Sequence, residues 1–233
     1  MTGPVDYTSA RLGDRADARV ADFLRRVYGW MCLGLLVTAG VAYFTASTPP
    51  LFQALASNRL LFWGIAIAEL GLVWYASARI SVLSAEAAGG LFLLYSALNG
   101  LTLSFILVLF TGARLAGAFA ISAGMFAAMA VFGVVTRRSL QGVAQFAFMG
   151  LVGLIIASIV NWFLKSDALD FVLSVVGVIV FAGLTAWDMQ RLKRMALAME
   201  GGPAGAYAVG GALSLYLDFI NLFLSILRFS NRR

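Results

Sequence analysis

The chain has 233 residues, of which 61% are hydrophobic and 12% are charged, and its net charge is +6. Soluble proteins average roughly 45–50% apolar and about 25% charged residues, so this composition indicates an integral membrane protein. The sequence contains one cysteine and no histidine, which excludes an intrachain disulfide, a zinc or haem site built on imidazole, and catalysis by a histidine base.

Residues 1–27 are polar and contain aspartates and arginines in mixed order. They lack an early apolar core followed by a small-residue cleavage site, so they do not resemble a signal peptide. Val20, Phe23, Leu24 and Val27 have the spacing of one helix face. This spacing predicts a short amphipathic helix that lies on the membrane surface before the first span, with a disordered tail as the alternative.

Six strongly apolar segments follow, and each is close to the ~20 residues that a helix needs to cross a bilayer core of ~30 Å. Thr48-Pro49-Pro50 is expected to end the first segment, and Gly201-Gly202-Pro203 to interrupt the chain before a last one. No other stretch is long enough for a soluble domain, so we predict an N-terminal cytoplasmic or interfacial segment, residues 1–27, and one seven-helix transmembrane domain, residues 28–233. The six segments are Tyr28–Ala46, Leu60–Ser77, Ala87–Phe110, Ala113–Val135, Val143–Leu164 and Leu169–Trp187.

The basic residues predict how the chain is oriented in the membrane. If the N-terminus is cytoplasmic, the cytoplasmic segments before the last span carry eleven Lys and Arg residues and the outer connections carry three. Cytoplasmic loops are enriched in Lys and Arg, so this bias favours a cytoplasmic N-terminus. It also explains the positive net charge as a topology signal, and no nucleic-acid partner is expected. The three outer residues are Arg59, Arg114 and Lys165.

The last apolar segment, Leu213–Arg228, carries an aspartate near its middle. On a helix, Ser214, Asp218, Asn221 and Ser225 follow at steps of four, three and four residues and form one polar stripe. A carboxylate at membrane depth costs a few kcal/mol or more unless it is protonated, paired or hydrated, so other helices must cover this stripe or an aqueous path must run along it. We therefore predict an all-α integral membrane protein with seven transmembrane helices and this last helix at the centre of the bundle.

Two topologies stay open for the C-terminus. Gly210-Gly211 is expected to mark the start of the last helix, which leaves about 16 residues, or roughly 24 Å, before Arg228. A seventh span of this length is marginal and places Arg228, Arg232 and Arg233 outside, against the charge rule. A re-entrant hairpin would return them to the cytoplasm. Seven spans are the favoured interpretation.

Three acidic residues lie inside or at the edge of the apolar segments: Glu69, Asp188 and Asp218. If the sixth segment continues as a helix to about Lys193, Asp188 lies roughly 7 Å from its cytoplasmic end, and Asp218 lies roughly 10 Å beyond Gly211 on a helix that runs back. The two aspartates are therefore expected at similar depth on adjacent antiparallel helices. Two close carboxylates in a low dielectric cannot both ionise cheaply, so the pair would share a proton and respond to pH as one unit.

Arg79 is the candidate counter-charge for this pair. It ends the span that carries Glu69, on the same side of the membrane as Asp188, and a guanidinium can bridge two carboxylates. Two alternatives stay open. Arg79 can be a topology signal alone, and Asp188 can form an ordinary interfacial ion pair with Arg191 or Lys193.

Asn99 forms a polar patch in the third segment, with Ser96 and Thr102 on the same helix face. Such a patch more often makes interhelical hydrogen bonds than a pore. Carboxylate, Ser and Asn oxygens suit a hard, partly hydrated divalent cation, so Asp188 and Asp218 are candidate ligands for such a cation, but their spacing does not choose the ion. The candidate residues for a polar network or pore are Glu69, Asn99, Ser214, Asn221 and Ser225.

Four motifs follow one another in the chain: Glu69-Leu-Gly-Leu-Val, Leu94-Tyr-Ser-Ala-Leu-Asn-Gly-Leu-Thr-Leu-Ser104, Thr185-Ala-Trp-Asp-Met-Gln190 and Tyr216-Leu-Asp-Phe-Ile-Asn-Leu-Phe-Leu224. In content and order they resemble the Bax inhibitor family of membrane proteins, from about residue 20 to the end. The resemblance implies a seven-helix fold and a cation leak, chiefly for calcium, that a pair of aspartates gates. It maps these aspartates onto Asp188 and Asp218, and the family's second-span arginine onto Arg79.

The favoured function is therefore a pH-sensitive, passive cation leak channel, with Ca²⁺ as the transported ion and no required cofactor. The alternative is a non-conducting interaction protein that modulates a membrane protease or a stress or cell-death pathway through its charged N-terminal segment. The expected partners are the lipid bilayer, calcium ions and, for the alternative, a membrane protease. The single Cys and the short tails are compatible with a bacterial inner membrane.

An enzyme is not expected. Intramembrane aspartyl proteases also use two aspartates, but their Gly-x-Gly-Asp and Pro-Ala-Leu motifs are missing here. A retinal protein needs a Schiff-base lysine within a span, whereas Lys165 and Lys193 lie at the loops.

Overall fold

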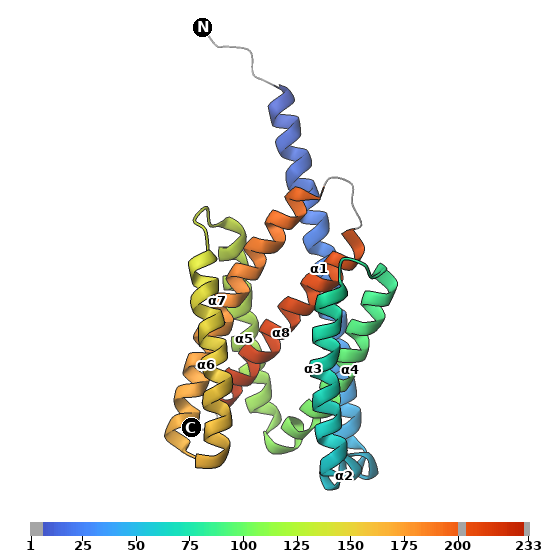
Figure 1. Ribbon diagram of the computed structural model, residues 1–233, viewed down its shortest axis with the longest axis vertical. Coiled ribbons are helices and arrows are strands. Elements are labelled where there is room, and N and C mark those ends of the chain that lie inside the picture. Colours follow the sequence, from blue (N-terminus) through green and yellow to red (C-terminus); the bar gives the residue numbers. More distant parts are fainter. Residues whose placement is uncertain (1–6, 200–203, 231–233) are drawn as a thin grey trace.

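The computed structural model describes residues 7–199 and 204–230, and this part of the chain contains eight α-helices and no strand. Seven of these helices are long and apolar enough to cross a membrane, which confirms the predicted all-α fold with seven spans. Successive spans run in opposite directions (Figure 1). The helices are α1 (Tyr7–Ser47), α2 (Pro49–Ser57), α3 (Arg59–Arg79), α4 (Ala85–Leu109), α5 (Gly112–Val135), α6 (Gln141–Leu164), α7 (Asp167–Ala198) and α8 (Ala204–Ser230).

The first helix differs from the prediction for residues 1–27. No separate surface helix precedes the first span, because α1 continues without a break from Tyr7 to Ser47. Val20, Phe23 and Val27 form the predicted apolar face, but they are buried in the protein core and do not lie on the membrane surface. The boundary predicted after residue 27 therefore falls inside a single helix.

The helix ends follow local sequence signals. Pro49 lies in the first turn of α2, where its missing N–H is not needed, and the sequence analysis did not predict this short helix. The side chains of Asn58, Ser84 and Ser166 accept hydrogen bonds from backbone N–H groups in the first turns of α3, α4 and α7. These caps lie in the connections between spans, where helix N-termini would otherwise leave unpaired donors.

The start of the last helix also differs from the prediction. Gly210 and Gly211 do not begin it, because α8 extends from Ala204 to Ser230 and contains 27 residues. At 1.5 Å per residue the helix is about 40 Å long, enough for a tilted span. Its diagonal course across the bundle is visible in Figure 1. The seven-span topology therefore holds without a re-entrant hairpin, while Gly201-Gly202-Pro203, Arg232 and Arg233 lie outside the described residues.

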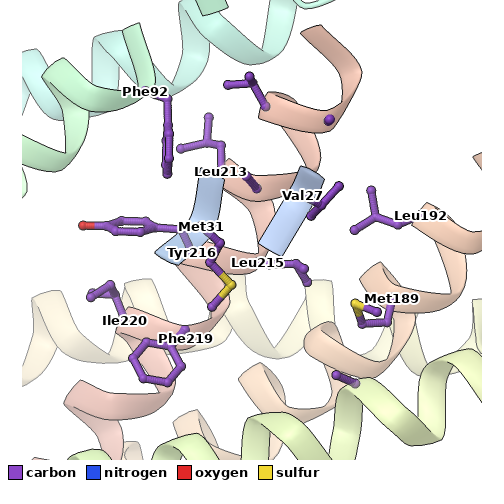
Figure 2. Close-up of a cluster of buried hydrophobic side chains, with 14 of the residues drawn as sticks. Val27, Met31, Phe92, Met189, Leu192, Leu213, Leu215, Tyr216, Phe219 and Ile220 are labelled. Atoms are coloured by element: carbon purple, nitrogen blue, oxygen red, sulfur yellow. The ribbon is translucent and has the colours of Figure 1, made fainter. Parts of the chain in front are cut away.

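Helix α8 packs against α1, α4, α5 and α7, and more of it is buried than of any other candidate span. Helix α8 lies between two groups of helices. In one group α3 and α4 lie near α1, and in the other α5 and α6 lie near α7. Figure 2 shows part of this core: Leu213, Leu215, Tyr216, Phe219 and Ile220 of α8 lie among Val27 and Met31 of α1, Phe92 of α4, and Met189 and Leu192 of α7.

The outer surface of the bundle is apolar. Leu70 and Trp74 of α3 are 74% and 75% exposed, and Phe163 of α6 is 76% exposed. Such large exposed apolar side chains would be costly in water, but they suit contact with lipid tails. This surface is what a multi-pass membrane protein requires.

Candidate functional site

Asp188 of α7 and Asp218 of α8 face each other between the two helices. Their carboxyl groups lie within hydrogen-bonding reach of each other, and the residues are only 6% and 5% exposed. The Oδ2 atom of Asp218 is buried and has no hydrogen-bond partner in the described part of the chain. Two carboxylates this close repel each other unless they share a proton or a cation lies beside them. The predicted pairing of the two aspartates is therefore what the structure contains.

Arg191 supplies a cation beside this pair. Its Nη2 atom lies 2.9 Å from Oδ1 of Asp188, one helical turn away, and donates a hydrogen bond of 3.0 Å to Oγ of Ser214. The contact with Asp188 is an ion pair and not an aligned hydrogen bond. The guanidinium also lies over the Trp187 ring, 5.0 Å from its centre. Arg191 thus connects α7 to α8 next to the two aspartates.

Arg79 is not brought to the aspartates. Its side chain is exposed at the C-terminal end of α3, where a cation is favourable for the helix dipole, and it forms no ion pair with any described residue. Ala76 and Ser77 of α3 and the following Ile80 line a cavity of 190 Å³ beside Arg191 and Ser214. In this structure the counter-charge is therefore Arg191, one of the two alternatives weighed for Asp188.

The polar stripe of the last helix lies against α7. Ser214 contacts Arg191, Asp218 contacts Asp188, and Ser225 lies so close to Gly177 that a Cβ atom there would overlap its hydroxyl. Asn221 and Ser225 donate hydrogen bonds to carbonyl groups of their own helix, and both line a cavity of 340 Å³ between α6, α7 and α8. The stripe is therefore shielded from lipid, as its polarity requires.

Glu69 and Asn99 belong to a second polar cluster, in the other half of the bundle. The half-buried Glu69 carboxylate of α3 accepts hydrogen bonds from Asn99 Nδ2 at 3.3 Å and from Thr102 Oγ1 at 3.0 Å, both on α4. Asn99 Oδ1 in turn accepts one from the Tyr216 hydroxyl of α8 at 3.0 Å. The predicted polar network is therefore divided in the structure: Glu69 and Asn99 connect α3, α4 and α8, whereas Ser214, Asn221 and Ser225 belong to the stripe that lies against α7.

The sequence analysis did not single out Tyr216 and Thr38. Tyr216 is fully buried, and its hydroxyl lies 2.7 Å from Oγ1 of Thr38 in α1. The Thr38 hydroxyl also lies within hydrogen-bonding distance of the carbonyl oxygens of Gly34 and Ser96, which compete for its single proton. Tyr216 is two residues from Asp218, so the two side chains lie on nearly opposite faces of α8. The signal that could have found Tyr216 is its hydroxyl, which gives α8 a polar group on the face opposite Asp218.

The aspartate pair is not a preformed calcium site. Ca²⁺ takes six to eight oxygen ligands, whereas the described residues contain no group of three or more His, Cys, Asp or Glu side chains that could hold a metal ion. The ion pair with Arg191 also occupies one side of Asp188.

Comparison with known proteins extends this description. The family model described as "Inhibitor of apoptosis-promoting Bax1" matches residues 20–233. Inner membrane protein YbhL of Escherichia coli (strain K12) is 47% identical over 220 residues, which cover 93% of this chain and 94% of the relative. An uncharacterized protein of Deinococcus radiodurans is 44% identical over 216 residues, with 92% of each chain covered. An uncharacterized membrane protein of Streptococcus pyogenes serotype M1 is 39% identical over 234 residues, or 100% and 99% of the two chains.

Proposed function

The chain belongs to the Bax inhibitor family and is a multi-pass inner membrane protein, and on this premise we propose that it is a passive, pH-sensitive cation leak gated by Asp188 and Asp218. The transported ion under this proposal is Ca²⁺, and no cofactor or catalytic group is needed. The observation that carries the proposal is a pair of buried carboxyl groups that join α7 to α8 at hydrogen-bonding range, with Arg191 as the neighbouring cation.

The proposed gate works through the charge of the pair. While the two carboxyl groups share a proton, they hold α7 and α8 together, and the ion pair of Arg191 adds to this contact. A change in the number of bound protons alters the repulsion between the two groups, which is strong because little water surrounds them. The helices then move relative to each other. Cavities of 190 Å³ and 340 Å³ along the stripe of α8 would be the nearest space for a hydrated path.

The test is Ca²⁺ flux into proteoliposomes over a series of pH values. The wild type would be compared with Asp188→Asn and Asp218→Asn, and with Glu86→Gln as a control, because Glu86 is an exposed carboxylate in the first turn of α4. Both aspartate variants are expected to change the pH response of the flux, whereas the control keeps it. A pH-dependent flux that neither aspartate variant alters, with both proteins folded, would sink the proposal.

A second candidate is the non-conducting interaction protein. The first turns of α1 project beyond the other helices in Figure 1, and side chains such as Arg15, Asp17 and Arg19 are exposed. This projecting segment would be the docking surface for a membrane protease or for a component of a stress or cell-death pathway. Deletion of residues 1–19 removes it and keeps the buried residues from Val20 onward. A leak should survive this deletion, whereas a docking function should be lost.

A further inference from the structure

A cavity of 260 Å³ lies at the end of α5 that faces the N-terminal side of the membrane. Its wall is formed by the connection between α5 and α6 and by the last turns of α7. Four basic residues line it together with two hydroxyl groups, and no carboxylate is among the lining residues. They are Arg137, Arg138, Lys193, Arg194, Thr136 and Ser139.

The connection is held in place by two side chains of α7. Gln190, which is 7% exposed, accepts a hydrogen bond from Leu140 N at 3.0 Å and donates one to the Arg138 carbonyl oxygen at 2.9 Å. Lys193 Nζ donates a hydrogen bond of 2.9 Å to the Val134 carbonyl oxygen at the end of α5. These bonds fix the backbone that carries Arg137 and Arg138, so the four basic groups converge on a defined cavity.

No carboxylate of the described residues neutralises the positive charges at this cavity. None of the four basic residues forms an ion pair with an Asp or Glu of residues 7–199 or 204–230, and Arg137, Arg138 and Arg194 are exposed. A topology signal needs positive charge on this side of the membrane, but it does not need a cavity or a rigid connection. The arrangement therefore calls for an anionic ligand.

The surroundings of the cavity indicate which anion fits. Val131, Phe132 and Val135, in the last turns of α5, are 63%, 50% and 70% exposed. They form an exposed apolar surface on the last turns of α5, the helix whose end leads into Arg137 and Arg138. A lipid places its phosphate group in the basic cavity and its acyl chains on the apolar surface of α5. A free phosphate would occupy the basic cavity and leave the apolar surface without a partner. Basic pockets between helices on this side of a membrane are a known way to bind lipid headgroups.

We propose that this cavity binds the phosphate headgroup of an anionic bilayer lipid. Arg137, Arg138 and Arg194 contact the phosphate oxygens, and the tails lie along the end of α5. Lys193 contributes positive charge but keeps its hydrogen bond to the Val134 carbonyl oxygen at the C-terminal end of α5. The site is separate from the aspartate pair, and the proposal does not depend on ion conduction.

The experiment measures binding of phosphatidylglycerol to the purified full-length protein in detergent, by native mass spectrometry, with phosphatidylcholine as the neutral comparison. The test variant carries Arg137→Gln, Arg138→Gln and Arg194→Gln. The control variant carries Arg15→Gln, Arg19→Gln and Arg79→Gln, three exposed arginines on the same side of the membrane but outside the cavity. Both variants lose the same charge, so general attraction to anionic lipid is weakened equally.

At least a tenfold weaker affinity for phosphatidylglycerol is expected in the test variant, and less than a threefold change in the control. An equal loss in both variants would overturn the proposal in favour of general electrostatic attraction. Displacement of the lipid by millimolar inorganic phosphate would overturn it in favour of a free phosphate site. If the triple variant does not fold, Arg137→Gln and Arg194→Gln are measured singly, and each is expected to weaken binding about threefold; no change in either contradicts the site.

Discussion

A Cβ atom at Gly133 of α5 would overlap the carbonyl oxygen of Ala186 in α7 and would lie 3.0 Å from Cβ of Met189. Glycine therefore lets the two helices approach closely, two residues before Asp188. The obstacle at Ala186 is backbone, which cannot turn away as a long side chain can. The position of α7 relative to α5, and with it the position of the aspartate pair, depends on this contact.

Gly133→Ala is accordingly expected to destabilise the protein by about 1–3 kcal/mol, the usual cost of overpacking a well-packed interior. Gly124→Ala in the same helix is the control, because no atom lies within 4 Å of a Cβ atom at that position. The measurement is the thermal unfolding midpoint in detergent. Equal midpoints for the two variants would show that the α5–α7 contact adjusts without cost.

Arg191→Gln is expected to change the pH dependence of ion flux. The substitution removes the positive charge 2.9 Å from Asp188, and a cation favours the ionised form of a neighbouring carboxylate. The midpoint of the flux-against-pH profile should therefore move to higher pH, by roughly one unit, while Arg191→Lys keeps the charge and shifts it less. Arg79→Gln removes the same charge from an exposed position and should leave the midpoint unchanged. The opposite pattern would restore Arg79 as the counter-charge.

Tyr216→Phe is expected to lower the free energy of unfolding by about 1–3 kcal/mol. The substitution removes the hydroxyl that bonds to Asn99 and Thr38, and a buried polar atom left without its partner carries a cost of this size. Tyr95→Phe is the matched control: its ring packs edge-on against Tyr216 at 5.8 Å, but its hydroxyl makes no hydrogen bond within the described ranges. Chemical denaturation in detergent gives the comparison, and a smaller effect for Tyr216→Phe than for Tyr95→Phe would contradict the network.

Gln190→Leu is expected to speed trypsin cleavage after Arg137 and Arg138 at least fivefold. Gln190 makes two hydrogen bonds to the backbone of this connection, and their loss lets the segment open into the protease. Gln145→Leu, an exposed position on α6, is the control and should not change the rate. The cleavage rate is followed by gel electrophoresis of the protein in detergent. Equal rates for wild type and Gln190→Leu would mean that the connection is held by other contacts.

Most of the fold could be predicted from local patterns. Each of the six predicted apolar segments lies in one helix, with Phe110 alone falling one residue beyond α4, because the length and hydropathy needed to cross a bilayer are properties of the segment alone. The helices are α1, α3, α4, α5, α6 and α7. The two errors concern boundaries. Residues 7–27 belong to the same helix as the first span. The Gly210-Gly211 pair lies inside α8, where Ile80 and Leu192 pack closely against the two glycines.

The identity of the candidate site was partly predictable. Asp188 and Asp218 were paired from their depth along antiparallel helices, which is a matter of helix rise and span length. The partner of Asp188 was not decided in this way, because Arg191 on the same helix and Arg79 at the end of α3 lie at the same side of the membrane, and helix rise does not tell whether α3 approaches α7. Tyr216 was missed because an aromatic residue in an apolar segment is usually core or interface.

The sequence by itself determined six membrane spans, which ends of them carry the positive charge, and that the polar stripe of the last helix needs cover; it favoured a seventh span without excluding a re-entrant hairpin. These properties follow from the free-energy cost of exposing polar groups to lipid. This cost depends on the composition of each segment and not on the positions of its neighbours. Only the tertiary structure decided which side chains of different helices meet: Arg191 with Ser214, Tyr216 with Asn99 and Thr38, and Gln190 with the α5–α6 connection. Such contacts depend on helix rotation and approach, which side-chain packing sets collectively across the whole bundle.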